Sequence, residues 1–375
     1  MVFNIQLRFS QRMWKEPPLS PIQHSIHSSS TSPWKTKSPH PGKGLQSFPH
    51  LPHPYYDYYN KFNKKQVFAS DPMRNDSKTD TKRREEDLNI ICDKTLLSAA
   101  IDGVSKAVTL RSTIPVLEGI LLKAEGFQLT LTGYDLEMGI VTTIEANVKE
   151  PGEIVLNAKL LSSMISRMPA GQITIQSADN GKTTIQSGVA QFEIQSMSAT
   201  DFPELPNTGA EETLTIKTGV LRDMIDRTLY AVSQDEKKPA HTGELFEIEP
   251  DKMTIVALDG YRLAIVERPV TAVKDIRIIV PSKTMTEVSH LLPNDDEEPV
   301  HICANRRYVV FMTAGYTIMS RLIEGEFLNY HNVIPAGSRT RVTIDTKEFI
   351  ETIERASLII TERLKNSPPH HFYRG

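Results

Sequence analysis

The chain has 375 residues, with 43 Lys+Arg against 46 Asp+Glu and a formal net charge of -3. This length allows two or three domains, and a composition of 39% hydrophobic and 24% charged residues excludes a fibrous or wholly disordered protein. Two cysteines, Cys92 and Cys303, exclude a disulfide scaffold and favour a reducing compartment; neither has metal-ligand spacing around it, so no metal site is expected. No run approaches the roughly 18 apolar residues of a membrane helix, so no membrane contact is expected.

Residues 1–87 differ sharply from the rest of the chain. They hold 14 Lys+Arg, 8 Asp+Glu and 10 of the 24 prolines, whereas the remaining residues carry 29 basic against 38 acidic side chains. With few aliphatic residues, this basic, Pro- and Ser-rich extension is predicted to be disordered. Three explanations stay open: an organelle transit peptide, a functional basic tail, or upstream sequence translated from a wrongly assigned start, with the true start at Leu88.

After residue 88 the sequence repeats with a period of 124 residues, and residues 97–169 align with 221–293 without a gap. Apolar positions of an expected helix return at the same spacing: Leu97, Ile101 and Val108 as Leu221, Ile225 and Val232. A third copy begins near Val342, with Phe349, Ile353 and Ile360 in the matching positions.

Each copy is expected to fold in the same order. A helix (97–108 in the first copy) is followed by alternating strands such as 127–132, then by a second helix (159–168, or 283–292 in the second copy) and further strands. Two helices against antiparallel strands make an α+β domain of about 120 residues. The expected organisation is an extension (1–87), two complete domains (88–209 and 210–338) and the start of a third (339–375).

Several strings, in this order and spacing, resemble the bacterial sliding clamps, the beta subunits of DNA polymerase III. One of them is Ser112-Thr-Ile-Pro-Val-Leu-Glu-Gly, and the most specific are Asp259-Gly-Tyr-Arg-Leu-Ala and Phe202-Pro-Glu-Leu. The resemblance covers residues 88–366. It implies tandem clamp domains, with two subunits of three domains closing head-to-tail into a ring around duplex DNA, helices inside and sheets outside. It also implies a non-catalytic, cytoplasmic bacterial replication factor without a cofactor. Its implied partners are double-stranded DNA, the polymerase III catalytic subunit, the clamp loader and other proteins with a clamp-binding motif.

The excess of acidic over basic side chains in residues 88–375 suits a ring that encircles DNA. Such a ring is held by its topology and needs only weak contacts with the DNA inside it. Basic residues should then concentrate on the helices and adjoining loops. From these positions and the resemblance, the candidate DNA contacts are Arg111, Lys159, Arg167, Arg222, Gln234 and Lys283, and Arg227 lies on the same helix as Arg222. For any single lysine a solvated helix face is an equally good interpretation.

The resemblance also implies a hydrophobic cleft that accepts a short peptide from polymerases, the clamp loader and repair proteins. The matching positions are His241, Leu258, Gly260, Tyr261, Arg262, Leu263 and Val333. An apolar cleft with few polar groups suits an aliphatic-aromatic peptide. The alternative is a turn at a strand end with a buried Leu263. His241 and Leu258 replace the Leu and Thr expected from some members, and the rest of the cleft would belong to the third domain.

The third copy supplies only a first strand and helix before the pattern ends at Asn366. We therefore expect its apolar face to be exposed and poorly ordered, and the homodimer ring not to close. The alternative functions are a peptide-binding scaffold that forms no ring and an inactive clamp fragment. An enzyme has little support, because Gly181-Lys182-Thr183 lies in an expected hairpin turn rather than a phosphate loop, and Asp295 to Glu298 read as a solvated turn.

Overall fold

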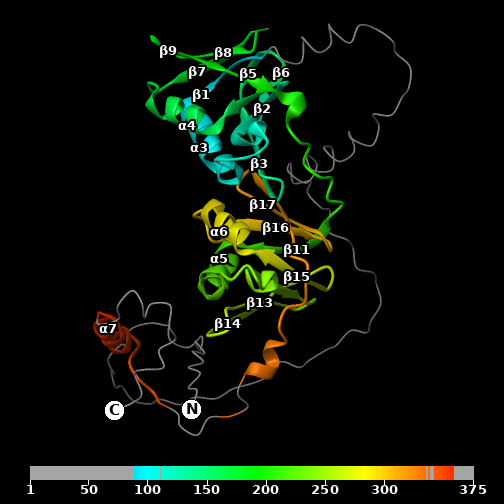
Figure 1. Ribbon diagram of the computed structural model, residues 1–375, viewed down its shortest axis with the longest axis vertical. Helices are drawn as coiled ribbons and strands as arrows, with labels where there is room; N and C mark the ends of the chain where they lie inside the picture. Colours follow the sequence, from blue (N-terminus) through cyan, green and yellow to red (C-terminus); the bar gives the residue numbers. More distant parts are fainter. Residues whose placement is uncertain (1–87, 110, 179, 335–336, 338–341, 359–375) are drawn as a thin grey trace, which may run out of the picture. The chain divides into compact units, whose positions relative to one another are not determined.

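The structure is a computed structural model that describes residues 88–109, 111–178, 180–334, 337 and 342–358 (Figure 1). The predicted extension over residues 1–87, and the part of the predicted third copy after residue 358, lie outside the described residues. No described helix is long and apolar enough to cross a membrane.

The described residues of the first repeat form two helices and ten strands. Its strands are β1 (Asn89–Asp93), β2 (Gly119–Glu125), β3 (Gln128–Tyr134), β4 (Met138–Glu145), β5 (Asn147–Glu150), β6 (Gly152–Asn157), β7 (Gln172–Ser177), β8 (Lys182–Ser187), β9 (Ala190–Gln195) and β10 (Met197–Ser198). Its helices are α3 (Lys94–Val104) and α4 (Ala158–Arg167), with 3-10 turns η1 (Ser105–Ala107), η2 (Pro115–Glu118) and η3 (Ala199–Asp201). Asp93 caps α3 by accepting hydrogen bonds from the Thr95 and Leu96 amides, which lowers the pKa of its carboxyl.

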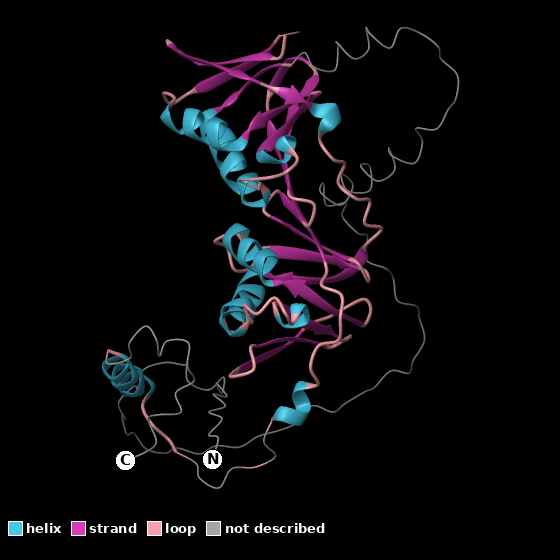
Figure 2. Ribbon diagram, in the orientation of Figure 1, coloured by secondary structure: helices cyan, strands magenta, loops and turns pink. Residues whose placement is uncertain are grey.

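The second repeat follows the same order. Its strands are β11 (Glu211–Lys217), β12 (Gly243–Ile248), β13 (Lys252–Leu258), β14 (Leu263–Pro269), β15 (Ile276–Pro281), β16 (Pro299–Ala304), β17 (Tyr308–Thr313) and β18 (Tyr316–Arg321). Its helices are α5 (Thr218–Asp226) and α6 (Ser282–Leu291), with 3-10 turns η4 (Leu229–Ala231), η5 (Pro239–His241) and η6 (Tyr330–Val333). In each repeat the two helices lie on one side of the strands (Figure 2).

The described strands form three antiparallel sheets. A nine-stranded sheet has the order β10-β6-β2-β3-β4-β18-β17-β16-β11 and therefore passes from the first repeat into the second through the β4–β18 pair. Ile140 of β4 lies opposite Ile318 of β18, and both side chains are fully buried. The other two sheets are β5-β1-β7-β8-β9 and β14-β13-β12-β15. The junction between the repeats is thus a continuous backbone ladder with an apolar centre.

Strand register confirms the internal repeat. In the β3–β4 pair Tyr134 lies opposite Gly139, and 124 residues later Leu258 lies opposite Leu263 in the β13–β14 pair. The two repeats are therefore tandem copies of one α+β unit, as predicted, and these equivalent strands pair in the same register.

The opening helices are shorter than predicted. α3 ends at Val104 and α5 at Asp226, so Val108 and Val232 lie beyond their helices. A hydroxyl hydrogen-bonds to the backbone at each end: Ser105 Oγ donates to the Ile101 carbonyl (2.6 Å) and Thr228 Oγ1 to the Met224 carbonyl (2.8 Å). Such bonds offer the backbone an alternative to further helical turns.

The start of the third copy forms a separate helix, α7 (Thr346–Ser357), capped by Asp345. It buries no residue, and the side chains of Ile350 and Ile353 are about half exposed. The expected exposure of this apolar face is therefore confirmed for the described part of the segment.

Candidate DNA-facing and peptide-binding sites

The four helices of the two repeats are neighbours in a row. α3 contacts α4 and α5 contacts α6. Across the junction, Lys106 in η1 forms an ion pair with Glu287 of α6, with 3.2 Å between Nζ and Oε2. The order along the row is therefore α4, α3, α6, α5. Charges placed on this row can act together on one extended polyanion.

Four of the predicted DNA contacts are exposed side chains on or beside this row. Lys159 and Arg167 lie at the two ends of α4, Arg111 lies between η1 and η2, and Gln234 follows η4. Arg111, Lys159 and Arg167 have no ion-pair partner among the described residues. Their charges are available to a phosphate backbone, which attracts Lys and Arg independently of base sequence.

Arg222 and Lys283 are engaged within the protein, which the sequence did not reveal. Arg222 donates hydrogen bonds to the Asp296 carboxylate and to the Pro293 carbonyl. Lys283 of α6 pairs with Asp135, whose side chain is only 5% exposed, and this pair links the two repeats. Both side chains therefore fix the position of neighbouring segments, and a DNA contact by either would compete with an internal carboxylate.

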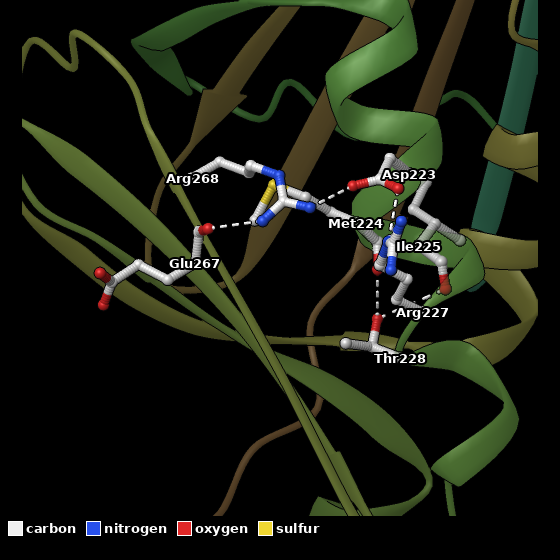
Figure 3. A network of polar contacts seen from close by, with 7 residues as sticks. All are labelled: Asp223, Met224, Ile225, Arg227, Thr228, Glu267 and Arg268. Carbon is white, nitrogen blue, oxygen red and sulfur yellow. Dashed lines mark hydrogen bonds and ion pairs between the residues drawn. The ribbon is translucent and has the colours of Figure 1, made fainter. Parts of the chain in front are cut away.

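A further network occupies the end of α5 (Figure 3). Asp223 accepts ion-paired hydrogen bonds from Arg227 and from Arg268 of β14. Burial alone would raise the pKa of the Asp223 carboxyl, but the two guanidinium groups outweigh it and hold that pKa below its usual value. The charge of Arg227, just after α5, is thus partly neutralised by Asp223 of that helix.

An apolar cluster lies where β12, β13 and β15 meet the segment after β18. We call it the η6 cluster; its buried members are Leu245, Val256, Leu258, Ile279, Phe327 and Tyr330, with Ala240, Leu263, Ile265, Ile323 and Ile334 packed against them. It contains Leu258 and Leu263 of the predicted peptide pocket. The ring of His241 lies edge-on to Phe327, with 5.5 Å between centroids, and burial followed by the Lys238 charge lowers the pKa of this imidazole.

The remaining pocket candidates form an exposed rim. Asp259 folds the turn between β13 and β14 by accepting hydrogen bonds from the Tyr261 amide (2.9 Å) and the Arg262 amide (3.1 Å). Gly260 has φ +92°, a conformation that favours glycine. The Tyr261 side chain is 70% exposed. Arg262 pairs with Asp259 at 2.9 Å and lies over the Tyr230 ring.

Val333 is placed differently from the other candidates. Val333 is 48% exposed and lies outside the η6 cluster. Its neighbour Ile334, in contrast, packs against that cluster. Sequence reasoning also missed Phe327 and Tyr330, although the string from Glu326 to Tyr330 resembles the one from Asp201 in the first repeat. The Tyr330 hydroxyl donates to Glu247 Oε2 (2.6 Å), and burial, then this bond, raises the pKa of the phenol.

A pocket of about 430 Å³ opens beside the η6 cluster, and none of the predicted peptide residues lines it. Its apolar wall is formed by Leu245, Ile279, Ile323 and Phe327, and Arg277, Arg306, Glu324 and Glu326 stand around it. The volume suits a side chain or two of a bound peptide rather than a large cofactor.

Two segments considered as possible catalytic motifs, at Gly181 and at Asp295 to Glu298, both lie in turns. The described part of the chain holds no cluster of His, Cys, Asp and Glu suited to a metal. Gly181 has φ +74° in the turn between β7 and β8, as a hairpin requires. The turn near Asp296 is exposed, as predicted, and two ion pairs also hold it: Asp296 accepts from Arg222 and Glu297 from Lys217.

Two domain families match this architecture. The DNA polymerase III beta subunit N-terminal domain matches residues 88–206, and the DNA polymerase III beta subunit central domain matches residues 215–329. The chain belongs to the DNA polymerase III beta-subunit family. Among the relatives of this beta-subunit chain is the beta sliding clamp of Halalkalibacterium halodurans, 33% identical over 287 residues, which cover 73% of this chain and 75% of the relative. The Bacillus subtilis beta sliding clamp is 31% identical over 283 residues, with 73% and 75% covered.

Solved beta-subunit structures agree with this assignment. A crystal structure of a putative DNA polymerase III beta subunit from Eubacterium rectale has a TM-score of 0.71 at 33% identity and covers 74% of this chain and 75% of its own. The Bacillus subtilis sliding clamp has a TM-score of 0.71 at 30% identity, with the same coverage. A Pseudomonas aeruginosa sliding clamp bound to griselimycin has a TM-score of 0.69 at 28% identity and covers 74% and 76%.

Proposed function

We propose that this beta-subunit family member acts as a DNA sliding clamp, a processivity factor that tethers the replicative polymerase to duplex DNA. The observation that carries the proposal is the match to both beta-subunit domain families across the two repeats. Its relatives include proteins named beta sliding clamp. The row of four helices gives the repeats one continuous surface on which duplex DNA can lie.

On this surface we propose that Arg111, Lys159 and Arg167 supply most of the attraction for DNA, because their charges are not paired among the described residues. Gln234 can hydrogen-bond to phosphate from its exposed position. Arg222 and Lys283 are assigned a lesser share because Asp296 and Asp135 already hold them. Contacts of this kind ignore base sequence, as a mobile tether requires.

The partner site is proposed at the η6 cluster and the rim beside it. Leu258, Leu263 and His241 would form the apolar floor, with Gly260, Tyr261, Arg262 and Val333 around it. An aliphatic-aromatic segment from the polymerase catalytic subunit, the clamp loader or another clamp-binding protein fits such a surface. With no catalytic constellation assigned, the protein is proposed to be a non-catalytic accessory subunit of the bacterial cytoplasm, with domain boundaries near 88–209, 210–338 and 339–375.

Retention on DNA of different topology tests the tether. The protein is loaded by the clamp loader onto a nicked circular plasmid and onto the same plasmid linearised, and the fraction retained after gel filtration is measured. A topological tether stays on the circle and slides off the linear form. Equal retention on both forms would contradict a topological tether and indicate ordinary electrostatic binding to DNA. Retention on neither, with a polymerase-tail peptide still bound, would support the alternative of a peptide-binding scaffold.

A further inference from the structure

The pocket of about 430 Å³ beside the η6 cluster is lined by charged side chains of both signs around its apolar wall. Arg277 lies in β15, and Arg306 lies in the turn between β16 and β17. Glu324 and Glu326 both lie in the segment after β18. The cations and the anions that line the pocket therefore come from different segments of the second repeat.

Backbone hydrogen bonds fix these segments to one another. The Ile323 amide donates to the Ile279 carbonyl (3.0 Å), which ties the segment after β18 to β15. The Leu322 amide donates to the Arg307 carbonyl (2.8 Å), which ties the same segment to the turn between β16 and β17. Both bonds are internal to the protein, so the pocket is formed before a ligand arrives. Binding to such a site avoids the entropic cost of ordering a loop.

Two of the four charges are already used within the protein. Arg277 pairs with Glu247 of β12, with 3.0 Å between Nε and Oε1, and Glu324 pairs with the last residue of β18 at 3.8 Å. Arg306 and Glu326 are both exposed, and neither has an ion-pair partner among the described residues. One cation and one anion at the pocket are therefore left for a ligand.

We propose that this pocket binds a peptide segment of a partner protein in which an apolar side chain is flanked by one acidic and one basic residue. The apolar side chain would pack against Leu245, Ile279 and Phe327, which are buried residues of the pocket wall. The acidic side chain would pair with the guanidinium group of Arg306, whose planar shape matches a carboxylate. The basic side chain would pair with the carboxylate of Glu326.

The arrangement of the two charges favours a peptide over a free amino acid. Both charges of a free amino acid are attached to the same carbon atom, whereas Arg306 and Glu326 lie in different segments and do not pair with each other. The flanking side chains of a peptide can spread apart to reach both groups. A volume of about 430 Å³ also exceeds what one aliphatic side chain fills, which leaves room for the peptide backbone beside it.

This pocket is separate from the partner site proposed at the rim of the η6 cluster. None of the predicted peptide residues lines it. Phe327 is common to both places, because it lines the pocket and the His241 ring lies edge-on to it. We therefore expect a peptide in the pocket to leave the rim residues free. The assignment needs neither DNA nor a peptide at the rim, so it stands or fails independently of the proposed function.

Fluorescence polarisation of short labelled peptides, titrated with the full chain, tests the site. The probes have blocked ends and are Gly-Ser-Glu-Leu-Lys-Ser-Gly, its reversed charge order Gly-Ser-Lys-Leu-Glu-Ser-Gly, and versions of both with serine in place of leucine. We expect saturable binding of at least one leucine peptide and about a tenfold loss of affinity with serine, because the apolar side chain is removed. No saturable binding of either leucine peptide, or equal binding of the serine versions, would overturn the proposal. Displacement by free leucine at the same concentration would show that the pocket takes an amino acid and would overturn the peptide assignment.

Charge reversal checks which groups bind the peptide. Arg306→Glu should weaken the leucine peptide about tenfold, because an attraction becomes a repulsion, and a Lys-Leu-Lys peptide should recover that loss. Arg307→Glu is the matched control: it makes the same charge change at the adjacent exposed arginine, which does not line the pocket, and should bind like the wild type. Tyr261→Ala, at the rim, should also leave these peptides unaffected.

Two results of these variants would refute the assignment. Equal losses in Arg306→Glu and Arg307→Glu would indicate general electrostatic attraction rather than a site. A loss in Tyr261→Ala, with Arg306→Glu unchanged, would place the peptide at the rim instead of the pocket.

Discussion

The buried carboxyl of Glu244 should make the stability of the second repeat depend on pH. Glu244 is fully buried in β12, next to the end of α5, and Thr228 Oγ1 hydrogen-bonds to its Oε1. Its other oxygen, Oε2, has no partner among the described residues. Burial raises the pKa of this carboxyl from 4.5 to about 8, against the smaller opposing effect of the Thr228 hydroxyl. In the folded protein the group is therefore protonated near neutral pH.

The sign and size of the effect follow from proton linkage. The unfolded chain ionises Glu244 above pH 4.5, whereas the folded chain keeps its proton until about pH 8. Stability is therefore greatest below the lower value, falls as pH rises between them, and is constant above the higher one. Each step of one pH unit in this window costs about 1.4 kcal/mol, so stability falls by about 3 kcal/mol near pH 7 and by about 5 kcal/mol over the whole window.

Glu244→Gln removes the titration but keeps the shape and a hydrogen-bonding partner for Thr228. Urea unfolding at several pH values, followed by circular dichroism, should show the variant more stable than the wild type by about 3 kcal/mol near pH 7 and by less than about 1 kcal/mol near pH 5. Glu150→Gln, at an exposed position, is the control for removal of one negative charge. Its difference from the wild type in unfolding free energy should not grow as the pH rises. Parallel stability curves for wild type and Glu244→Gln would show that this carboxyl is already ionised in the folded state, and the reasoning would be wrong.

Three further predictions concern the sites. Leu258→Ala removes buried volume from the η6 cluster and should destabilise the protein by about 2–5 kcal/mol in urea unfolding, while also weakening the binding of a polymerase-tail peptide in calorimetry; unchanged peptide affinity in the folded variant would place the peptide elsewhere. Changing Lys159 and Arg167 to Gln should weaken DNA binding equally on every sequence, with thermal unfolding unchanged. The slope of log binding constant against log salt concentration should become shallower by about one for each phosphate that is no longer neutralised. An unaltered slope would show that α4 does not contact DNA. Burial raises the pKa of the Cys92 and Cys303 thiols to about 12, so neither should react with a thiol reagent near pH 8 until urea exposes both, and rapid labelling of the native protein would contradict their burial.

Sequence periodicity predicted the repeat, and the strand register confirms it. It could not place the ends of α3 and α5, because Ser105 and Thr228 bond to the backbone only once a turn has formed. It also could not tell which cations are free. Lys159 and Lys283 occupy equivalent positions in the two repeats, yet among the described residues only Lys283 has an ion-pair partner. That partner is Asp135, brought from 148 residues away by the β4–β18 junction.

The candidate pocket shows the same division. Leu258 and Leu263 were found from the string around Asp259, a local signal that needs no folding to be visible. Phe327 and Tyr330 pack into the same cluster from the segment after β18, and no local sequence pattern predicts that contact. By itself the sequence determined the repeated unit, its α+β order and its family, because these depend on spacing along the chain. Tertiary structure alone decided which of the described charges are neutralised and which apolar side chains share a cluster, because both depend on which distant segments are brought close together.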